Sequence, residues 1–324
     1  MTLRVSVVVP TYRRPFLLDR CLRALVGQDL PRGEYEIVVV DDANDAKTRE
    51  VVEDYGREGD IAPPIRYECV TGRHGPAIAR NRGWRAARAP IVSFTDDDCV
   101  PQSDWLRHGL LALDGGAAAA WGRIRVPLPP EPTDYERDAA RLADAGFVTA
   151  NCFCRREALQ AVGGLDERFT AAFREDSDLY FSLLERGLPV VHAPRAIVVH
   201  PLRPAGWGES LRQQRKILFD ALLYKKHPAL YRARIRRTPR WDYYGIVALL
   251  GLALGGAAAG ATGVALGAGA GWAGMTAQLF ATRLAGTRRS PAHVAEMALT
   301  SALIPPLAVY WRLVGAVRFR TAFF

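Results

Sequence analysis

Ile-Val-Ser-Phe-Thr-Asp-Asp-Asp, residues 91–98, is an apolar run that ends in three consecutive carboxylates. The run predicts a buried strand that delivers acids to the edge of a sheet. Three adjacent like charges repel one another, so they must fan out into water, take up protons or share a cation. Carboxylates at this spacing suit Mg²⁺ or Mn²⁺, which bind oxygen ligands. The alternative is a solvated acidic turn after a strand.

A second strand-like run, residues 37–40, also ends in acids, Asp41 and Asp42. Residues 5–9 form an earlier run whose β-branched side chains are typical of a parallel strand covered on both faces. Helical spacing between these runs predicts a doubly wound, mostly parallel α/β sheet with right-handed crossovers. Ligands bind at the carboxyl ends of such strands, so two acidic strand ends on one rim suggest a site.

The next part of the chain continues the alternation. Pro76 begins a helix, as proline favours a first helical turn. Further strands are expected at about 65–70, 121–126, 147–154 and within 189–200. The acids of the run Glu-Asp-Ser-Asp, residues 175–178, open a helix that extends to about residue 187. Acids in a first turn also favour the helix dipole, so this pattern alone does not prove a site.

The charge of the 324-residue chain is concentrated in one segment. The formal net charge is +9, and residues 201–241 contain eleven Lys and Arg against Glu209 and Asp220. This basic block leads into an apolar stretch, which favours anionic lipid headgroups at a cytoplasmic face. Nucleic acid is the disfavoured alternative, because few aromatic side chains for base stacking accompany the block. The five scattered cysteines indicate reduced thiols, and the N-terminus lacks a signal-peptide pattern.

No formally charged residue occurs between Tyr243 and Thr282. A single helix of that length would extend about 60 Å, twice the hydrocarbon thickness of a bilayer. We therefore expect a hairpin of two membrane spans over 243–282 that turns near 260–263, with a buried soluble hairpin as the alternative. Residues 291–317 suit a re-entrant or interfacial helix better than a third span.

Six ordered motifs resemble those of the family-2 glycosyltransferases of the GT-A fold, which are inverting enzymes that use nucleotide-diphosphate sugars. The motifs are Val-Val-Val-Pro-Thr-Tyr-Arg-Arg-Pro (7–15), Val-Val-Val-Asp-Asp (38–42), Gly-Pro-Ala-Ile-Ala-Arg-Asn-Arg-Gly (75–83), Thr-Asp-Asp-Asp (95–98), Gly-Gly-Leu-Asp-Glu-Arg-Phe (163–169) and Glu-Asp-Ser-Asp-Leu (175–179). The expected organisation is a glycosyltransferase domain over 1–205, basic amphipathic juxtamembrane helices over 206–241 and a membrane region over 242–324.

The resemblance implies a role for each motif. The residues expected to bind the nucleotide sugar are Pro10, Thr11, Tyr12, Arg13, Asp41 or Asp42, Arg80, Asp96 and Asp97. For Arg80 the alternative is a guanidinium stacked on the outside of a helix. Within the Asp-x-Asp pair, Asp98 is expected to touch the Mg²⁺ or Mn²⁺ ion directly and Asp96 the ribose or a metal-bound water, whereas Asp97 points away.

His200 closes the last strand, and the resemblance implies that it completes the metal site. Neutral imidazole is a reasonable ligand for Mn²⁺. A histidine that merely ends a strand is the alternative.

The resemblance assigns Asp176 as the general base, with Glu175 beside it. Close carboxylates raise one another's proton affinity, which suits a base. The Gln-x-x-Arg-Trp motif of processive synthases is incomplete, since Lys216 follows Arg215 where Trp is expected. Transfer of one sugar per encounter is therefore expected.

The predicted function is transfer from an NDP-sugar, most simply a UDP-sugar, to a lipid-linked or glycan acceptor at the cell membrane, with the catalytic domain cytoplasmic. Two alternatives remain: a soluble or protein acceptor, and a non-catalytic nucleotide-sugar sensor or scaffold.

Overall fold

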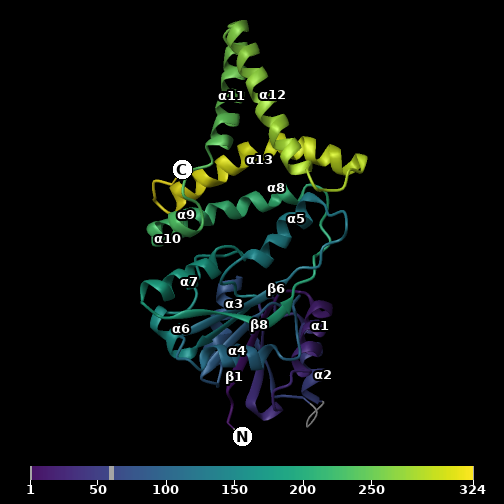
Figure 1. Cartoon of the computed structure of the whole chain (residues 1–324), viewed down its shortest axis with the longest axis vertical. Coiled ribbons are helices and arrows are strands. Elements are labelled where there is room, and N and C mark those ends of the chain that lie inside the picture. Colours follow the sequence, from purple (N-terminus) through teal and green to yellow (C-terminus); the bar gives the residue numbers. More distant parts are fainter. Residues whose placement is uncertain (1, 58–61, 324) are drawn as a thin grey trace. The chain divides into compact units, whose positions relative to one another are not determined.

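The computed structural model describes residues 2–57 and 62–323 (Figure 1). The chain divides into two compact units. The first, here called the sheet unit, contains the residues up to Pro127 together with Arg141–Pro201. The second, the helical unit, contains Leu128–Ala140 and the residues from Leu202 onward. The segment between two strands of the first unit thus belongs to the second.

A single sheet organises the sheet unit, with the strand order β3-β2-β1-β4-β7-β6-β8-β5 among the described residues. The strands β1 to β4 run parallel, β6 runs parallel to β8, and β7 runs antiparallel to both of its neighbours. The strands are β1 Val5–Thr11, β2 Tyr35–Asp41, β3 Ile65–Cys69, β4 Ile91–Thr95, β5 Val100–Pro101, β6 Ala119–Arg125, β7 Asn151–Arg155 and β8 Val190–Val199.

The predicted mostly parallel α/β fold is confirmed, with one local correction. The strand expected over 147–154 begins only at Asn151, whose backbone N–H donates to the carbonyl of Val148 in a tight turn. β7 then pairs antiparallel with both β4 and β6. Apolar patterning reports burial and carries no strand direction, so an antiparallel strand is compatible with the predicted, mostly parallel sheet.

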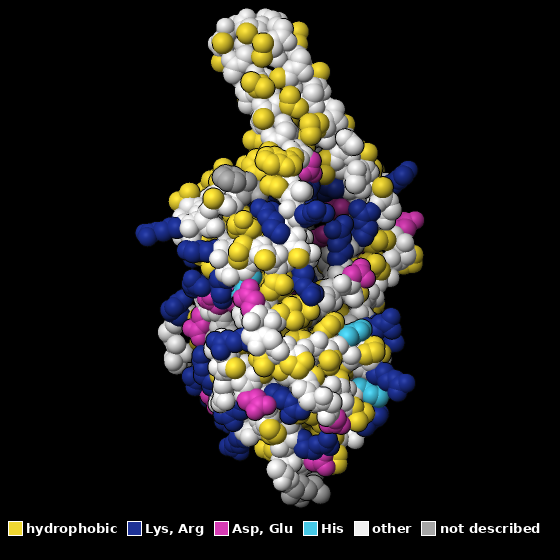
Figure 2. Space-filling model, turned by 60° about the vertical axis from the view of Figure 1, so that its left-hand side comes forward, with side chains coloured by type: hydrophobic (Ala, Val, Ile, Leu, Met, Phe, Trp, Pro, Cys, Tyr) yellow, Lys and Arg dark blue, Asp and Glu magenta, His cyan; other side chains and the backbone are white. Residues whose placement is uncertain are grey.

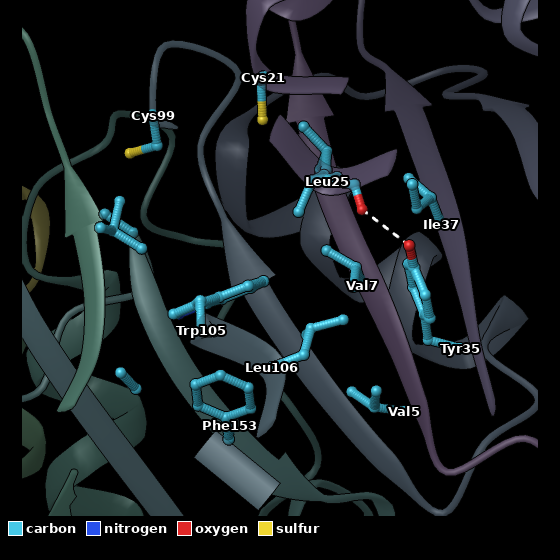
Figure 3. Packing of buried hydrophobic residues seen from close by; sticks show 14 of the residues in the cluster. Val5, Val7, Cys21, Leu25, Tyr35, Ile37, Cys99, Trp105, Leu106 and Phe153 are labelled. Carbon is cyan, nitrogen blue, oxygen red and sulfur yellow. Dashed lines mark hydrogen bonds between the residues drawn. The ribbon is translucent and has the colours of Figure 1, made fainter. Parts of the chain in front are cut away.

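Helices cover both faces of the sheet. They are α1 Pro15–Val26, α2 Ala46–Arg57, α3 Pro76–Ala86, α4 Trp105–Leu113, α6 Arg156–Val162 and α7 Glu175–Glu185. The core under α1 and α4 appears in Figure 3, where the Tyr35 hydroxyl donates to the Leu25 carbonyl at 2.9 Å. In the same core the rings of Trp105 and Phe153 lie 4.9 Å apart. The opposite core lies under α3, α6 and α7.

A glycine brings α3 close to the sheet. A Cβ on Gly83 would lie 2.3 Å from Val8 Cγ1 and 3.0 Å from Val40 Cγ2, so any side chain would push the helix outward. Because Arg80 lies one helical turn before Gly83, this contact fixes the depth from which Arg80 reaches the strand ends.

The helical unit consists of short basic helices followed by longer apolar ones. These are α5 Asp134–Ala140, α8 Glu209–Gln213, α9 Leu218–Lys226, α10 Pro228–Arg234, α11 Trp241–Ala258, α12 Thr262–Leu284 and α13 Pro291–Arg318. The helices α11 and α12 form a hairpin that turns through Gly260 at φ 72°. On the face shown in Figure 2 the hairpin carries apolar side chains.

By length and composition, α11 and α13 are apolar enough to cross a membrane, with mean hydropathies of 1.2 and 1.3. They differ in burial, because 11% of the apolar window of α11 is buried and 44% of that of α13. These two helices weakly suggest membrane association.

Arg283 at the end of α12 holds α5 in the helical unit. Its Nη2 lies 2.8 Å from Asp134 Oδ2, and its Nη1 donates to the Thr300 hydroxyl at 2.8 Å. The backbone N–H of Arg288 donates to the carbonyl of Pro132 at 2.9 Å. The proline-rich loop after β6 is therefore tied to the helices α12 and α13.

Candidate active site

The carboxyl ends of the parallel strands bring the predicted acids to one edge of the sheet. Thr11 ends β1 in register with Asp41 of β2, and β4 ends at Thr95 directly before the three aspartates. Parallel strands place such ends side by side, because their crossover helices return the chain to the opposite edge. The site therefore follows from the topology.

The three aspartates after β4 point to different partners. Asp96 Oδ1 accepts from Arg80 Nη2 at 2.6 Å. Asp97 turns inward, accepting from the Thr11 hydroxyl at 2.8 Å and from Arg14 Nη1 at 3.3 Å. Burial raises the pKa of the Asp97 carboxyl, and the Arg14 charge partly offsets this. Asp97 thus joins β4 to β1.

Asp98 lies beside His200, which follows β8. His200 Nε2 is 3.5 Å from Asp98 Oδ1, and Asp98 is 1% exposed. The backbone N–H of His200 donates to the Arg125 carbonyl at 2.8 Å, which fixes the end of β8 against β6.

A cation site can be formed by Asp98, Cys99 and His200, whose ligand atoms all lie within 4.8 Å of one another. Burial raises the pKa of the Cys99 thiol well above its usual value, so this sulfur is a poor ligand for a hard cation. The carboxylate and the imidazole remain, and this donor set fits Mn²⁺.

Arg80 connects the aspartates of β4 to the start of α7. Its Nη1 donates to Glu175 Oε1 at 3.1 Å, and its side chain is 3% exposed. Burial alone would lower the pKa of the guanidinium, but Asp96 and Glu175 outweigh burial and raise it. The charge is therefore fixed between two carboxylates.

The two acids that open α7 have different surroundings. Glu175 is 3% exposed, and burial together with the Asp176 charge raises its pKa to about 7 despite Arg80. Asp176 is partly exposed, and its Oδ1 accepts from the backbone N–H of Ser177 at 2.6 Å. Burial raises the pKa of Asp176, whereas the Ser177 N–H lowers it. The carboxylate of Asp176 is thus the more accessible of the two.

The two acids at the end of β2, Asp41 and Asp42, also differ. The carboxylate of Asp41 accepts from the N–H groups of Ala43 at 2.8 Å and Asp45 at 2.6 Å and from the Tyr67 hydroxyl at 2.8 Å. Asp41 thus shapes the loop.

Asp42 accepts from the N–H of Gly75 at 2.9 Å and faces His74 Nδ1 at 3.2 Å. A carboxylate has about four acceptor positions, so Asp42 keeps capacity for a ligand.

The residues after β1 continue this edge. Thr11 is buried, while Tyr12 is 50% exposed. Arg13 adopts φ 53° and its guanidinium lies 5.4 Å from the Tyr12 ring centroid. A left-handed conformation is uncommon for arginine and marks a sharp turn at the strand end.

A polar brace that the sequence did not predict joins α3 to the loop before α7. Asn81 Nδ2 donates to the Leu165 carbonyl at 2.8 Å, and its Oδ1 accepts from the N–H of Leu165 at 2.9 Å and from Trp84 Nε1 at 2.9 Å. A Cβ on Gly164 would lie 2.6 Å from Asn81 Oδ1. The signal in the sequence for this contact was the presence of both motifs, 75–83 with Asn81 and 163–169 with Gly164 and Leu165.

Two family models match the chain. The model described as glycosyl transferase family 2 matches residues 6–163, and that described as glycosyl transferase family group 2 matches residues 137–314.

Several curated relatives are similar over more than half of the chain, among them the following two. Glycosyltransferase AglE of Haloferax volcanii is 25% identical over 225 residues, which cover 66% of this chain and 71% of that protein. Validoxylamine A glucosyltransferase of Streptomyces hygroscopicus subsp. jinggangensis is 28% identical over 224 residues, covering 57% of this chain and 52% of that protein. The chain thus spans about half the length of the second relative.

Solved structures share the fold. The mannosyltransferase PcManGT from Pyrobaculum calidifontis, in complex with GDP-Man and Mn²⁺, aligns over 99% of this chain and 88% of its own with a TM-score of 0.59 at 20% identity. S. aureus TarS 1–349, in complex with UDP-GlcNAc, aligns over 98% of this chain and 93% of its own with a TM-score of 0.52 at 18% identity. Since the family group 2 model alone spans more than half of the sequence, the chain belongs to glycosyltransferase family 2, as its motifs predicted, and is a glycosyl-transferring enzyme.

Proposed function

We propose that this enzyme transfers one sugar, with inversion, from an NDP-sugar to a lipid-linked or glycan acceptor at the cytoplasmic face of the membrane. The observation that carries the proposal is the Arg80 guanidinium, which holds Asp96 and Glu175 together at the edge where Asp98, His200 and Asp176 also lie. This set contains both a cation site and a candidate base.

The donor is a nucleoside diphosphate sugar, most simply a UDP-sugar. Solved relatives of the same fold hold GDP-Man and UDP-GlcNAc, which supports this class of donor. We assign the base or ribose contact to Asp42, because the carboxylate of Asp41 already accepts from two N–H groups of its own loop and from the Tyr67 hydroxyl of β3. Pro10, Tyr12 and Arg13 line the same pocket.

Asp98 and His200 would hold a Mg²⁺ or Mn²⁺ ion, which supplies positive charge to the departing diphosphate when bound. The complex of PcManGT with Mn²⁺ supports a divalent ion. Asp96 faces Arg80 and sits one residue from Asp97, which is fixed to β1. Asp96 and Asp97, the two acids that precede Asp98, are thus each held in a fixed direction by the protein.

Asp176 is the general base. It takes the proton of the acceptor hydroxyl while that oxygen forms a bond to the anomeric carbon and the bond from this carbon to the diphosphate oxygen breaks. Glu175 is held by Arg80 in the interior, so it positions the start of α7 and shares charge with Asp176. An intact base argues against a sensor or scaffold.

The hairpin of α11 and α12 enters the bilayer in this proposal. Helices of 18 and 23 residues extend about 27 and 34 Å, close to the hydrocarbon thickness. The domain organisation proposed from the sequence, with 1–205 catalytic, 206–241 juxtamembrane and 242–324 in the membrane region, follows from this placement.

We place α13 at the interface. The Gly208 N–H donates to Glu296 Oε1 at 2.7 Å near its start, and Lys225 Nζ donates to the Phe319 carbonyl at 2.8 Å beyond its end. A crossing by α13 would therefore carry the charged segment 209–226 into the hydrocarbon, which is costly.

The test is release of nucleoside diphosphate by the detergent-solubilised chain from UDP-, GDP- and dTDP-sugars, with Mn²⁺, Mg²⁺ or chelator. We expect one nucleotide class to be turned over only with metal, and transfer to membrane-lipid extract to stop in Asp176→Asn. Metal-dependent nucleotide binding without any turnover would instead favour the sensor or scaffold. Transfer to a soluble glycan at the same rate as to the lipid extract would favour the soluble-acceptor alternative.

A further inference from the structure

One face of β6 carries a row of side chains that have no role in the proposed reaction as described above. Along the strand, Ala120 and Ile124 point into the core under α1 and α4. The alternate residues Trp121, Arg123 and Arg125 therefore share the opposite face, the one covered by α7. Trp121 is half-buried there, and both arginines are exposed.

Arg123 lies about level with the proposed base. The Trp121 ring centroid is 6.1 Å from that of Tyr180, and Tyr180 follows Asp176 by one helical turn on the same side of α7. Going back from Tyr180 to Asp176 covers about 6 Å along the helix. Going forward from Trp121 to Arg123 covers about 7 Å along the strand toward the same edge.

Arg125 continues the row to the candidate metal edge. Its carbonyl accepts from the N–H of His200, which places it one residue pair from the cation site. Within residues 2–57 and 62–323, the side chains of Arg123 and Arg125 form no ion pair or hydrogen bond. Asp98, Asp176 and Glu175 supply negative charge at this edge, which by itself would repel an anion. The two exposed arginines offset this charge and are suited to bind an incoming anion.

We propose that Arg123 and Arg125 bind a phosphate group of the acceptor, with Trp121 as the apolar floor beside it. The inference rests on the proposed glycosyl transfer and specifies its acceptor as a phosphate-bearing sugar. Guanidinium groups bind phosphate oxygens through paired, charge-assisted hydrogen bonds. Their place on the face of Asp176 puts the phosphate next to the hydroxyl that gives up its proton, on the acceptor side of the reaction.

The experiment compares three acceptor probes with the solubilised full chain: an isoprenyl diphosphate-linked GlcNAc, GlcNAc 1-phosphate and the neutral p-nitrophenyl GlcNAc. The variants are Arg123→Gln, Arg125→Gln, the double variant and Arg123→Lys. Arg88→Gln is the matched control, because Arg88 is exposed and precedes β4 at the opposite edge of the sheet. The KM values of acceptor and donor are measured separately.

We expect each glutamine variant to raise the KM of the phosphate-bearing probes about tenfold or more, with a smaller change for the neutral probe. Arg123→Lys should retain part of the preference for phosphate-bearing probes over the neutral probe, and Arg88→Gln should retain all of it. If both phosphate probes respond alike, the protein recognises phosphate itself. If only the isoprenyl probe responds, the recognised phosphate is that of a lipid carrier.

Equal changes for neutral and phosphate-bearing probes overturn the assignment, as does a rise confined to the KM of the donor. In either case donor turnover by the wild-type chain leaves the proposed glycosyl transfer intact. Absence of turnover with every donor and probe would instead remove the proposed function, and this inference with it.

Discussion

The Arg80 guanidinium lies 2.6 Å from Asp96 Oδ1 and thereby fixes the first of the three acids after β4. The same side chain lies 3.1 Å from Glu175 Oε1 at the start of α7. One buried cation thus connects the proposed donor side of the site to the proposed base side. Because the backbone at Gly83 packs directly on the sheet, α3 presents this cation from a fixed position.

Replacing Arg80 by lysine tests this connection. An ammonium group cannot bridge two carboxylates as a planar guanidinium does. We expect Arg80→Lys to lower transfer on the order of 10²-fold or more, because the base and Asp96 lose their alignment. Arg80→Met removes the guanidinium from the buried carboxylate of Glu175, whose side chain is 4% exposed, and should destabilise the fold by about 3–5 kcal/mol in urea unfolding.

Arg82 provides the control for Arg80. It lies on the same helix, but its side chain is 42% exposed and pairs with Glu68 at the surface. Surface ion pairs contribute little, so Arg82→Lys should change both activity and stability only slightly. A similar loss in both variants would show that α3 as a whole, and no specific bridge, is sensitive.

The acid pair at the start of α7 predicts a pH dependence of rate. Asp176 acts as a base only when ionised, and burial raises its pKa above the usual value. Transfer should therefore decline as the pH falls through that raised pKa, at a higher pH than for an exposed aspartate. Glu175, with its pKa at about 7, is already protonated where Asp176 titrates, so Glu175→Gln should leave the limb in kcat profiles nearly in place. A limb that moves to lower pH would show that Glu175 is ionised while Asp176 titrates.

The same pair predicts a pH dependence of stability. Folding raises the pKa of Glu175 from 4.5 to about 7, so the folded chain holds this proton more tightly than the unfolded chain. The contribution is fully present below about pH 4.5 and is lost as the pH rises to about 7. The loss amounts to about 3 kcal/mol. Unfolding of Glu175→Gln should lack this loss, which urea titrations at pH 5 and pH 8 would show as a smaller difference than in wild type.

Much of the sheet was predictable because strand burial and acidic strand ends are local patterns. Residues 37–42 and 91–98 contain both signals, and their side-by-side placement follows from parallel topology. The antiparallel direction of β7 was not predictable, since apolar patterning reports burial and carries no strand direction.

The partners of the site residues were less predictable than the residues themselves. Asp41 and Asp42 have the same side chain and adjacent positions. Asp41 accepts two hydrogen bonds from its own loop and one from Tyr67 of β3, whereas Asp42 faces Gly75 and His74. Strand alternation points neighbours in opposite directions but does not say which direction leads to the ligand. Only the loop geometry separates them.

The brace between Asn81 and Gly164 predicts a contrast between two adjacent glycines. Gly163 and Gly164 both adopt a left-handed backbone, at φ 79° and φ 78°. A Cβ on Gly163 meets no atom within 4 Å, whereas on Gly164 it would collide with Asn81 Oδ1 and Trp84 Nε1. Gly163→Ala should cost about 1–2 kcal/mol from backbone strain alone. Gly164→Ala should cost clearly more in urea unfolding and should also lower transfer, and equal costs would contradict the brace.

The cation site predicts direct binding of Mn²⁺. Paramagnetic resonance of the ion in the absence of nucleotide should show that Asp98→Asn and His200→Gln each weaken its binding. Cys99→Ala is the matched control, because its protonated thiol should contribute nothing. Unchanged affinity in His200→Gln would leave His200 as a strand-end residue, and weaker binding in Cys99→Ala would restore the sulfur as a ligand.

The placement of the helical unit in the membrane predicts a labelling pattern. In a Cys69→Ser background, single cysteines replace Ala261 in the hairpin turn, Arg289 after α12 and Ala322 after α13. Cys69 is the one partly exposed cysteine among the described residues, so it is removed. A membrane-impermeant maleimide applied to spheroplasts should label Ala261→Cys, because the hairpin exposes its turn on the far side of the bilayer.

The other two cysteines should react only after permeabilisation, since α13 stays beside the charged segment 209–226 on the near side. Labelling of Ala322→Cys from outside would show that α13 crosses, despite the contacts at Glu296 and Phe319. If all three cysteines required permeabilisation, the hairpin would lie on the near side as well. The apolar side chains of α11 and α12 would then have to be covered by protein, and a detergent-free soluble form should exist.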